Sequence, residues 1–215
     1  MNFRSSHRLN SKVGGQNHLN DDVLFESGNR WGVPEMGAIQ KSFIKSMKPF
    51  SHKGESEGVH FFVEDFTLNR VWNRVNFYGE KFKDFDLVLT PDFSLFTDMP
   101  LSLQIFNTYR NRYIGRAWQE MGLNVAPSVT WSDERSFEFC FDGIPKNSVV
   151  AISTQGAKDR ERFFAGFEEV LKSCTPAQIL VYGTSRYVSE IESFGVDCLF
   201  FQTHLEQKRK SNFLN

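Results

Sequence analysis

The sequence predicts an α/β protein with six parallel strands, and three observations support this fold class. Six short apolar runs recur along the chain, namely VHFFVEDF, DLVLTPD, NVAPSVTW, SVVAIST, QILVYG and DCLFFQT. The runs read as apolar on both faces, which is typical of strands buried in a parallel sheet. Segments with helical period, such as LSLQIFNTYRNRYIGRAWQEMG and DRERFFAGFEEVLKS, lie between them and would supply the crossovers that parallel strands need.

Two ways of closing such a sheet compete. One is an open, doubly wound sheet, and the other is a partial (β/α) barrel with about six strands. A dinucleotide-binding open sheet usually carries a Gly-rich phosphate loop after its first strand, and no such loop follows VHFFVEDF. The sequence therefore favours the partial barrel over the open sheet.

The chain divides into three parts by composition. Residues 1–57 are rich in Gly, Asn, Ser, Lys and His and are expected to form an irregular extension that packs on the domain. Residues 58–206 form the α/β domain, in which the short connection SDERSFEFCFDGIPKN predicts one helical turn plus a loop. Residues 207–215 form a basic tail that contains Lys208, Arg209 and Lys210.

Composition and motifs exclude several classes of protein. The 25 Lys and Arg residues against 26 Asp and Glu residues give a net charge of -1, which excludes a uniformly basic nucleic-acid coat. No apolar stretch is long enough to span a membrane, and no secretory signal is visible. Three widely spaced cysteines indicate free thiols in a reducing, cytoplasmic compartment. No Walker loop, GxSxG elbow or HExxH pair is present.

Carboxylates at two strand ends are the candidate catalytic residues. Asp65 follows the first apolar run and Asp92 follows the second. Ligands of parallel α/β folds meet the loops at the carboxyl ends of the strands. Asp65 and Asp92 could therefore act as an acid–base pair or hold a divalent cation through oxygen. The alternative is structural, with each aspartate capping a helix or pairing with an arginine.

Two arginines of the long predicted helix, which covers residues 101–121, are candidate substrate ligands. Arg110 falls in the middle of the apolar face of this helix. A guanidinium in apolar surroundings needs a carboxylate or a bound anion as its partner. Asp92 or Asp98 is the expected partner. In the structural alternative, Arg110 forms a buried ion pair with an aspartate and so holds the loop before the helix. In the functional alternative, the guanidinium groups of Arg110 and Arg112 bind an anion.

The same helix carries a candidate nucleic-acid surface. Tyr109, Tyr113 and Arg116 lie next to Arg112, and basic residues interleaved with aromatic ones can track a phosphate backbone while stacking bases. The alternative is a solvated helix edge. The later strand ends add three candidate substrate-binding residues, Trp131, Gln155 and Tyr182.

Five segments carry a resemblance to a known family: GNRWGVP, LTPDFSLFTDMP, NTYRNRYIG, VTWSDERSFEFCFDGIP and VVAISTQG. Over residues 29–183 the chain resembles a domain of unknown function, numbered four-four-one-seven, from bacteria, plasmids and phages. The resemblance implies a phage or mobile-element setting and a single α/β domain. It implies no reaction, so the candidate site residues depend on their positions alone.

The most favoured function is an enzyme that acts on an anionic substrate, a nucleotide or a nucleic acid, with the strand-end aspartates at its centre. One alternative is a non-enzymatic nucleic-acid-binding module. Another is a structural or assembly protein of a phage or plasmid complex, with other mobile-element proteins as partners. A tight cleft with both aspartates would favour the enzyme. An exposed groove with basic and aromatic residues would favour the binding module, and a large exposed patch of Phe side chains would favour the assembly protein.

Overall fold

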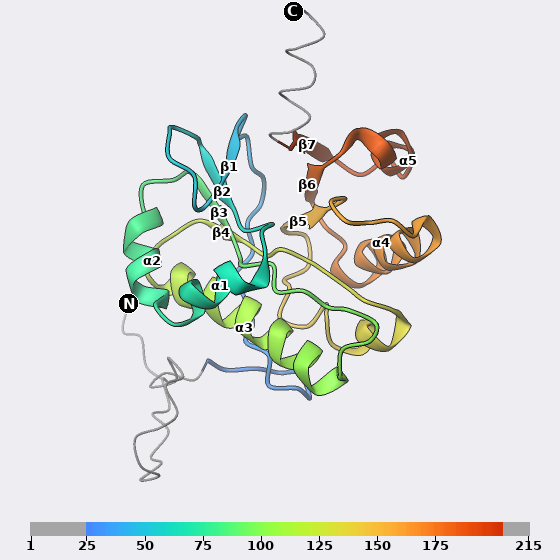
Figure 1. Cartoon of the computed structure of the whole chain (residues 1–215), viewed down its shortest axis with the longest axis horizontal. Helices are drawn as coiled ribbons and strands as arrows, with labels where there is room; N and C mark the ends of the chain where they lie inside the picture. Colours follow the sequence, from blue (N-terminus) through green and yellow to red (C-terminus); the bar gives the residue numbers. More distant parts are fainter. Residues whose placement is uncertain (1–24, 204–215) are drawn as a thin grey trace, which may run out of the picture.

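Seven short strands run parallel in the computed structural model, which describes residues 25–203 (Figure 1). They are β1 (Met47–Pro49), β2 (Gly58–His60), β3 (Leu87–Leu89), β4 (Val125–Ala126), β5 (Val149–Ser153), β6 (Gln178–Gly183) and β7 (Cys198–Gln202). Each of the six predicted runs overlaps one of the strands β2 to β7. The prediction of parallel strands in chain order is therefore confirmed.

The strands form two sheets and not one. The first sheet has the order β1-β2-β3-β4 and the second the order β5-β6-β7. A single parallel bridge between Ser128 and Ala151 lies where the sheets meet. There the Val129 N–H donates to the Ala151 carbonyl at 2.7 Å, and the Ala151 N–H donates to the Pro127 carbonyl at 2.8 Å. Strand order thus follows chain order from β1 to β7.

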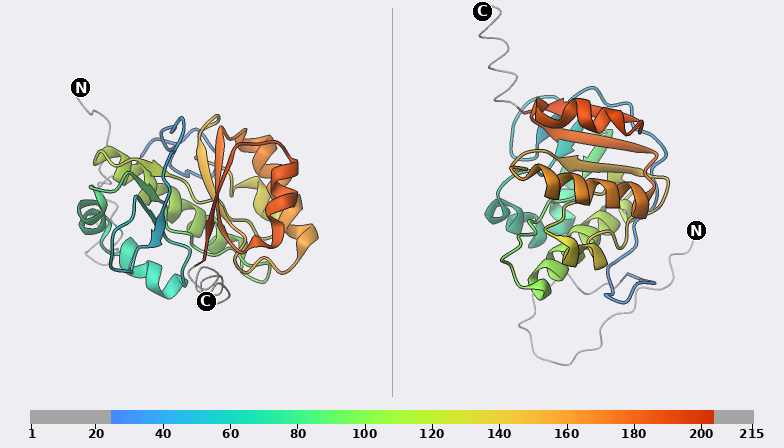
Figure 2. Two further views of the ribbon diagram at one scale, coloured as in Figure 1. Left: turned by 90° about the horizontal axis from the view of Figure 1, so that it is seen from above. Right: turned by 90° about the vertical axis from the view of Figure 1, so that its right-hand side faces the viewer.

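Helices cover the outer faces of both sheets. They are α1 (Asp65–Trp72), α2 (Val75–Phe82), α3 (Leu101–Glu120), α4 (Arg160–Cys174) and α5 (Val188–Ser193), with 3-10 turns η1 (Glu134–Glu138) and η2 (Ser185–Tyr187). Figure 2 shows α1 to α3 beside the first sheet and α4 and α5 beside the second. The turn η1 is the single helical turn that the sequence predicts after the third apolar run.

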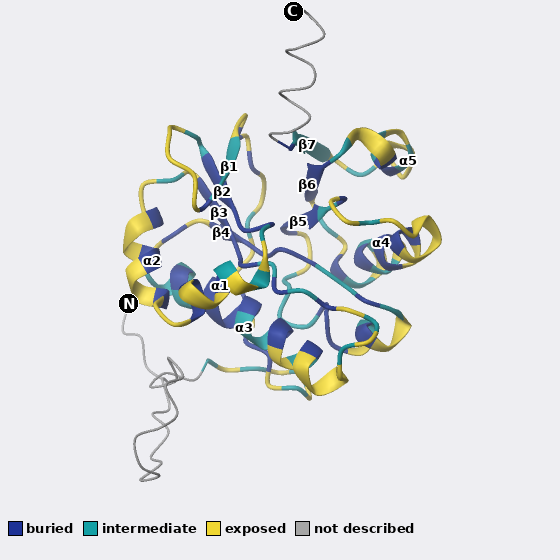
Figure 3. Cartoon of the chain, viewed as in Figure 1, coloured by how far each residue is buried: buried dark blue, intermediate teal, exposed yellow. Residues whose placement is uncertain are grey.

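Three apolar clusters make the core of the described residues. The inner strands β2 to β6 are buried, whereas the edge strands β1 and β7 are partly buried (Figure 3). One cluster packs the first sheet against α1 to α3, and a second packs β5 to β7 against α4 and α5. The third draws on both sheets, with Leu87 and Leu89 from β3 and Leu180 and Tyr182 from β6. Many of the buried side chains are phenylalanines, whose rings bury a large area per residue.

The predicted irregular extension contains a strand that the sequence did not reveal. Strand β1 lies inside residues 1–57 and pairs with β2. Its three residues are Met, Lys and Pro, so the segment has no apolar run like those that mark the other strands. Residues of this segment also contact later parts of the chain. The Trp31 indole N–H donates to the Glu138 carbonyl at 3.0 Å, and the Met36 N–H donates to the Gly143 carbonyl at 2.9 Å.

Two of the predicted segments lie outside the described residues. These are residues 1–24 of the predicted extension and the basic tail with Lys208, Arg209 and Lys210. Between residues 25 and 203, no helix is both long and apolar enough to cross a bilayer. The cysteines are free thiols; Cys140 and Cys174 are buried, whereas Cys198 is only partly covered.

Candidate active site

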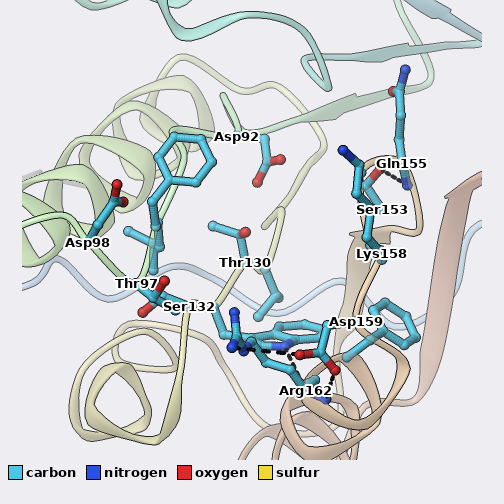
Figure 4. Close-up of a pocket in the computed structure, with 17 residues that line it drawn as sticks. Asp92, Thr97, Asp98, Thr130, Ser132, Ser153, Gln155, Lys158, Asp159 and Arg162 are labelled. Carbon is cyan, nitrogen blue, oxygen red and sulfur yellow. Dashed lines mark hydrogen bonds and ion pairs between the residues drawn. The ribbon is translucent and has the colours of Figure 1, made fainter.

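A cavity of about 510 Å³ lies where β3, β4 and β5 end, at the carboxyl edge of the strands (Figure 4). The loop after β3, the loop after β4, and the loop between β5 and α4 form its walls. Its lining residues are Asp92, Leu95, Phe96, Thr97, Asp98, Val129, Thr130, Trp131, Ser132, Ser153, Gln155, Gly156, Ala157, Lys158, Asp159, Arg162 and Phe163. Three of the sequence-predicted residues, Asp92, Trp131 and Gln155, therefore share one cavity.

Three aspartates line the cavity, and Asp92 is the least exposed of them. Figure 4 shows its carboxyl group directed into the space above Thr130. The Oδ1 atom is buried and accepts no hydrogen bond within the described part of the chain. Burial and the negative charge of Asp65 raise the pKa of Asp92 to about 7, against the positive charge of Arg112, which lowers it. A carboxyl group in this state can hold and release a proton near neutral pH.

Asp65 has a different role from Asp92. Its carboxylate accepts from the Ser94 backbone N–H at 3.1 Å and from the Ser94 hydroxyl at 2.8 Å. Asp65 therefore holds the loop after β3 and does not line the cavity. The structure places the two aspartates close enough for their charges to interact, but only Asp92 faces a ligand space.

The loop between β3 and α3 is anchored by polar side chains of α3. Gln104 donates from Nε2 to the carbonyls of Phe96 and Met99, both at 2.9 Å, and accepts from the Ser132 hydroxyl at 2.7 Å. Asn107 donates to the Ser94 carbonyl at 2.7 Å. Gln104 and Asn107 are both buried. The wall that carries Asp92 and Phe96 is thus held by hydrogen bonds from one rigid helix.

A buried polar network supports the ends of β3 and β4. The Thr90 hydroxyl donates to Asn111 Oδ1 at 2.8 Å and accepts from the Ser128 N–H at 2.7 Å. Asn111 donates to the Pro91 carbonyl at 2.8 Å and to the Ser128 carbonyl at 3.1 Å. Thr90, Asn111 and Ser128 are each at most a few per cent exposed. This network fixes the backbone immediately before Asp92 and Thr130.

The opposite wall, at the start of α4, is polar and partly cationic. Asp159 caps α4 by accepting from the Arg162 N–H at 3.1 Å, and its carboxylate lies 3.6 Å from the Arg162 guanidinium. Lys158 has no ion pair with any described residue. Gly156 has a φ of 81°, a conformation that favours glycine. Cations beside a helix N-terminus provide a favourable setting for an anion.

The prediction that Arg110 bonds to the carboxylate of Asp92 or Asp98 is wrong. Arg110 donates to Asn69 Oδ1 at 3.0 Å and also to Asn107 Oδ1. Its guanidinium lies 3.8 Å from the centroid of the Phe93 ring. It makes no ion pair with Asp92 or Asp98. The side chain is only partly buried, so hydrogen bonds to neutral acceptors and stacking on an aromatic ring are enough to hold the guanidinium. It lies outside the cavity lining.

The predicted nucleic-acid surface on α3 is also wrong, because most of it is interior. Arg112 and Tyr113 are 2% and 3% exposed, and Tyr109 is partly buried and packs on Tyr113. Arg116 forms an ion pair with Glu120, one turn away. Tyr113 packs on Trp72 of α1, whereas the Arg112 guanidinium donates to the carbonyls of Ser128, Cys140 and Asp142.

The remaining predicted substrate residues divide between two places. Trp131 and Gln155 line the cavity. Trp131 lies on α4 at Gly166, where a Cβ atom would approach the indole to about 2.0 Å. Tyr182 points instead into the cluster shared by the two sheets and stacks on Phe62 at 5.4 Å. Tyr182 is therefore a core residue.

Sequence reasoning missed the residues that complete the cavity. Lys158 and Arg162 belong to the β5–α4 connection, and Thr130 and Ser153 belong to the strand ends. The signal that could have found Lys158 was its place in TQGAKD, between a strand and a helix.

The donor set suits proton transfer better than metal binding. Within residues 25–203 no group of three or more His, Cys, Asp or Glu side chains is placed to hold a metal ion. A divalent cation such as Ca²⁺ takes about six to eight oxygen ligands. Asp65 already accepts hydrogen bonds from Ser94. Of the three aspartates in the cavity lining, Asp159 pairs with Arg162, which leaves the carboxyl groups of Asp92 and Asp98.

The chain is similar to one protein family and to two phage proteins. The profile of a family described as "Domain of unknown function (DUF4417)" matches residues 25–197. The Gene 1 protein of Mycobacterium phage L5 is 30% identical over 217 residues, which cover 96% of this chain and 94% of that protein. The Gene 1 protein of Mycobacterium phage D29 is 36% identical over 217 residues, 96% of this chain and 80% of that protein. No solved structure matches the chain.

Proposed function

The chain belongs to the DUF4417 family of phage-associated domains, and on that premise we propose that it is an enzyme acting on a small anionic substrate. Asp92 is its general acid–base. The observation that carries the proposal is a carboxyl group with a pKa raised to about 7 that faces a cavity at the strand ends. General acids and bases work best when their pKa lies near the working pH.

The two walls of the cavity indicate the class of substrate. Leu95, Phe96, Trp131 and Phe163 are apolar or aromatic, and Lys158 and Arg162 lie at the start of α4. A ligand with a flat ring and an anionic group would satisfy both walls. The volume of about 510 Å³ lies in the usual range for small-molecule sites. We therefore propose a nucleotide, or one nucleotide at the end of a single strand.

The proposal includes the architecture that supports the cavity. We infer that the two sheets are adjacent parts of one partial (β/α) barrel. Strand order follows chain order, whereas a doubly wound sheet changes direction at a switch point. The bridge between Ser128 and Ala151 and the cluster shared by both sheets support this inference. We also propose a cytoplasmic location, supported by the three free cysteines.

Nucleotide binding and turnover test the proposed function. The full chain would be titrated with ribonucleoside and deoxyribonucleoside 5′-monophosphates by calorimetry, and the mixtures then analysed by chromatography and mass spectrometry. We expect at least one nucleotide to bind and to be converted. Asp92→Asn should lower turnover by about 10²- to 10⁴-fold and preserve binding, and Lys158→Ala should weaken binding.

Asp84→Asn is the matched control, because Asp84 is an exposed aspartate remote from the cavity lining. It should leave both binding and turnover unchanged. The proposal fails if no nucleotide binds, or if Asp92→Asn turns over its substrate as fast as the wild type does.

An assembly role is the second candidate, because several large apolar side chains are exposed, and one of them, Phe96, lines the cavity. Phe66 is 85% exposed, Phe96 57% and Leu103 51%. Apolar patches on soluble proteins often mark contact sites, here for a further copy or another mobile-element protein. Light scattering at rising protein concentration would show larger species that Phe66→Ser with Leu103→Ser abolishes. A monomer at all concentrations would exclude self-assembly.

A further inference from the structure

Arg112 carries a buried charge that donates to no carboxylate within residues 25–203. Its side chain is among the largest fully buried ones, and the residue is 2% exposed. The guanidinium donates to the carbonyls of Asp142, Ser128 and Cys140 at 3.1, 3.1 and 2.8 Å, and to Asn111 Oδ1. All of these acceptors are neutral. Burying a charged group is costly unless an opposite charge lies nearby.

The hydrogen bonds of Arg112 lead directly to the strand ends of the cavity. Asn111, which accepts from Arg112, donates to the Pro91 carbonyl at 2.8 Å, one residue before Asp92. Ser128, whose carbonyl accepts from both Arg112 and Asn111, lies two residues before Thr130. The guanidinium therefore supports the backbone on both sides of the acid.

We propose that Arg112 is a positioning residue for Asp92, and that its buried guanidinium is the counter-charge of the Asp92 carboxylate. This inference rests on the proposed function of Asp92. Arg112 does not line the cavity, so it acts on a substrate only through Asp92 and the strand ends. Asp142 and Asp92 are the two carboxyl groups whose charge acts on this interior guanidinium, and the hydrogen bonds of Arg112 lead to the strand end that carries Asp92.

The charged groups around the pair determine the direction of the effect. Asp65 of α1 faces Asp92 and opposes its ionisation, whereas Arg112 of α3 favours it. On its other side, Arg112 faces Asp142 and the thiols of Cys140 and Cys174. Burial lowers the pKa of Arg112 to about 10, so the guanidinium keeps its charge at neutral pH. Removal of that charge leaves burial and Asp65 to act on Asp92 unopposed.

Arg110 provides a matched control on the same helix. It lies two residues from Arg112 and carries the same charge, and its electrostatic partner is Asp65. Arg110 is not among the charges that act on Asp92. Arg110→Met therefore removes one positive charge from α3 without removing the counter-charge of Asp92.

The test is a ¹³C NMR titration of the aspartate carboxyl carbons in the full-length protein, with the Asp92 signal assigned by its absence in Asp92→Asn. Arg112→Met should raise the midpoint of the Asp92 titration by about one pH unit. Arg112→Gln, which is also neutral, should do the same. Arg110→Met should leave the midpoint where it is in the wild type.

Two results would overturn the proposal. One is an unchanged Asp92 midpoint in a folded Arg112→Met or Arg112→Gln protein. The other is failure of both variants to fold, because Arg112 would then belong to the fold itself. A wild-type midpoint near 4 that still rises in Arg112→Met would remove the proposed function of Asp92 while leaving the coupling intact, so the two failures are distinguishable.

Discussion

Asp65 and Asp92 have identical side chains at neighbouring strand ends, and their surroundings give them different chemistry. Asp65 accepts hydrogen bonds from the Ser94 N–H and hydroxyl and thereby holds a loop. Asp92 has a buried oxygen without a donor and faces the cavity. The sequence could place both residues at the sheet edge, but it could not show that Ser94 would engage one of them.

Replacement of Asp92 should change how stability depends on pH. The folded state raises the pKa of Asp92 from an ordinary value of 3.8 to about 7, so it holds the proton more tightly than the unfolded chain does. The wild type should therefore lose stability relative to Asp92→Asn as the pH rises from about 4 to about 7, and the difference should be level above that. The expected loss is about 4 kcal/mol, measurable by urea unfolding at several pH values.

Asp84→Asn is the control for this measurement, because Asp84 is exposed. Its stability should follow the wild type across the same pH range. Parallel curves for the wild type and Asp92→Asn would show that Asp92 ionises equally well in the folded and unfolded chains.

At the scale of the element, α3 shows why part of the site could not be predicted. Its buried face carries Gln104, Asn107 and Asn111, whereas Leu101 and Leu103 are exposed. Hydropathy places apolar residues inside, so the pattern pointed to the wrong side of the helix at its N-terminal half. The polar residues are inside because they bond the strand-end loops. A local conflict between pattern and structure is a frequent property of functional sites.

The strands were predictable for the opposite reason. The run QILVYG forms β6, which is buried at every position, so its four central residues, ILVY, all carry an apolar signal. The two cations at the start of α4 were harder to assign. Lys158 and Arg162 line the same cavity as Asp92. They are far from Asp92 in the sequence, so the sequence alone does not show that these side chains lie together.

Asn111→Ala tests the network that α3 contributes. The substitution removes the bonds of Asn111 to Thr90, Pro91 and Ser128 and leaves buried polar groups without partners. Unpaired buried groups cost about 1 to 3 kcal/mol each, so we expect a loss of about 3 kcal/mol in urea unfolding.

Asn76→Ala is the matched control for this variant, since Asn76 is exposed on α2. It should change stability by less than about 0.5 kcal/mol. An equally small effect of Asn111→Ala would mean that water replaces the side chain, and that the network does not fix the strand ends.

For the molecule as a whole, the cluster shared by both sheets predicts one cooperative unfolding transition. Trp118 lies in the core of the first sheet and Trp131 packs against that of the second. Single-tryptophan variants that retain either residue should give coincident fluorescence transitions in urea. Two separate midpoints would show that the sheets unfold independently and would contradict a single domain.

An experimental structure with a bound nucleoside monophosphate would show whether the cavity is the nucleotide site. We expect the phosphate beside Lys158 and Arg162, and a polar atom of the sugar or base within about 3 Å of the Asp92 carboxyl group. A nucleotide bound elsewhere, with the cavity between β3, β4 and β5 still open, would contradict this expectation.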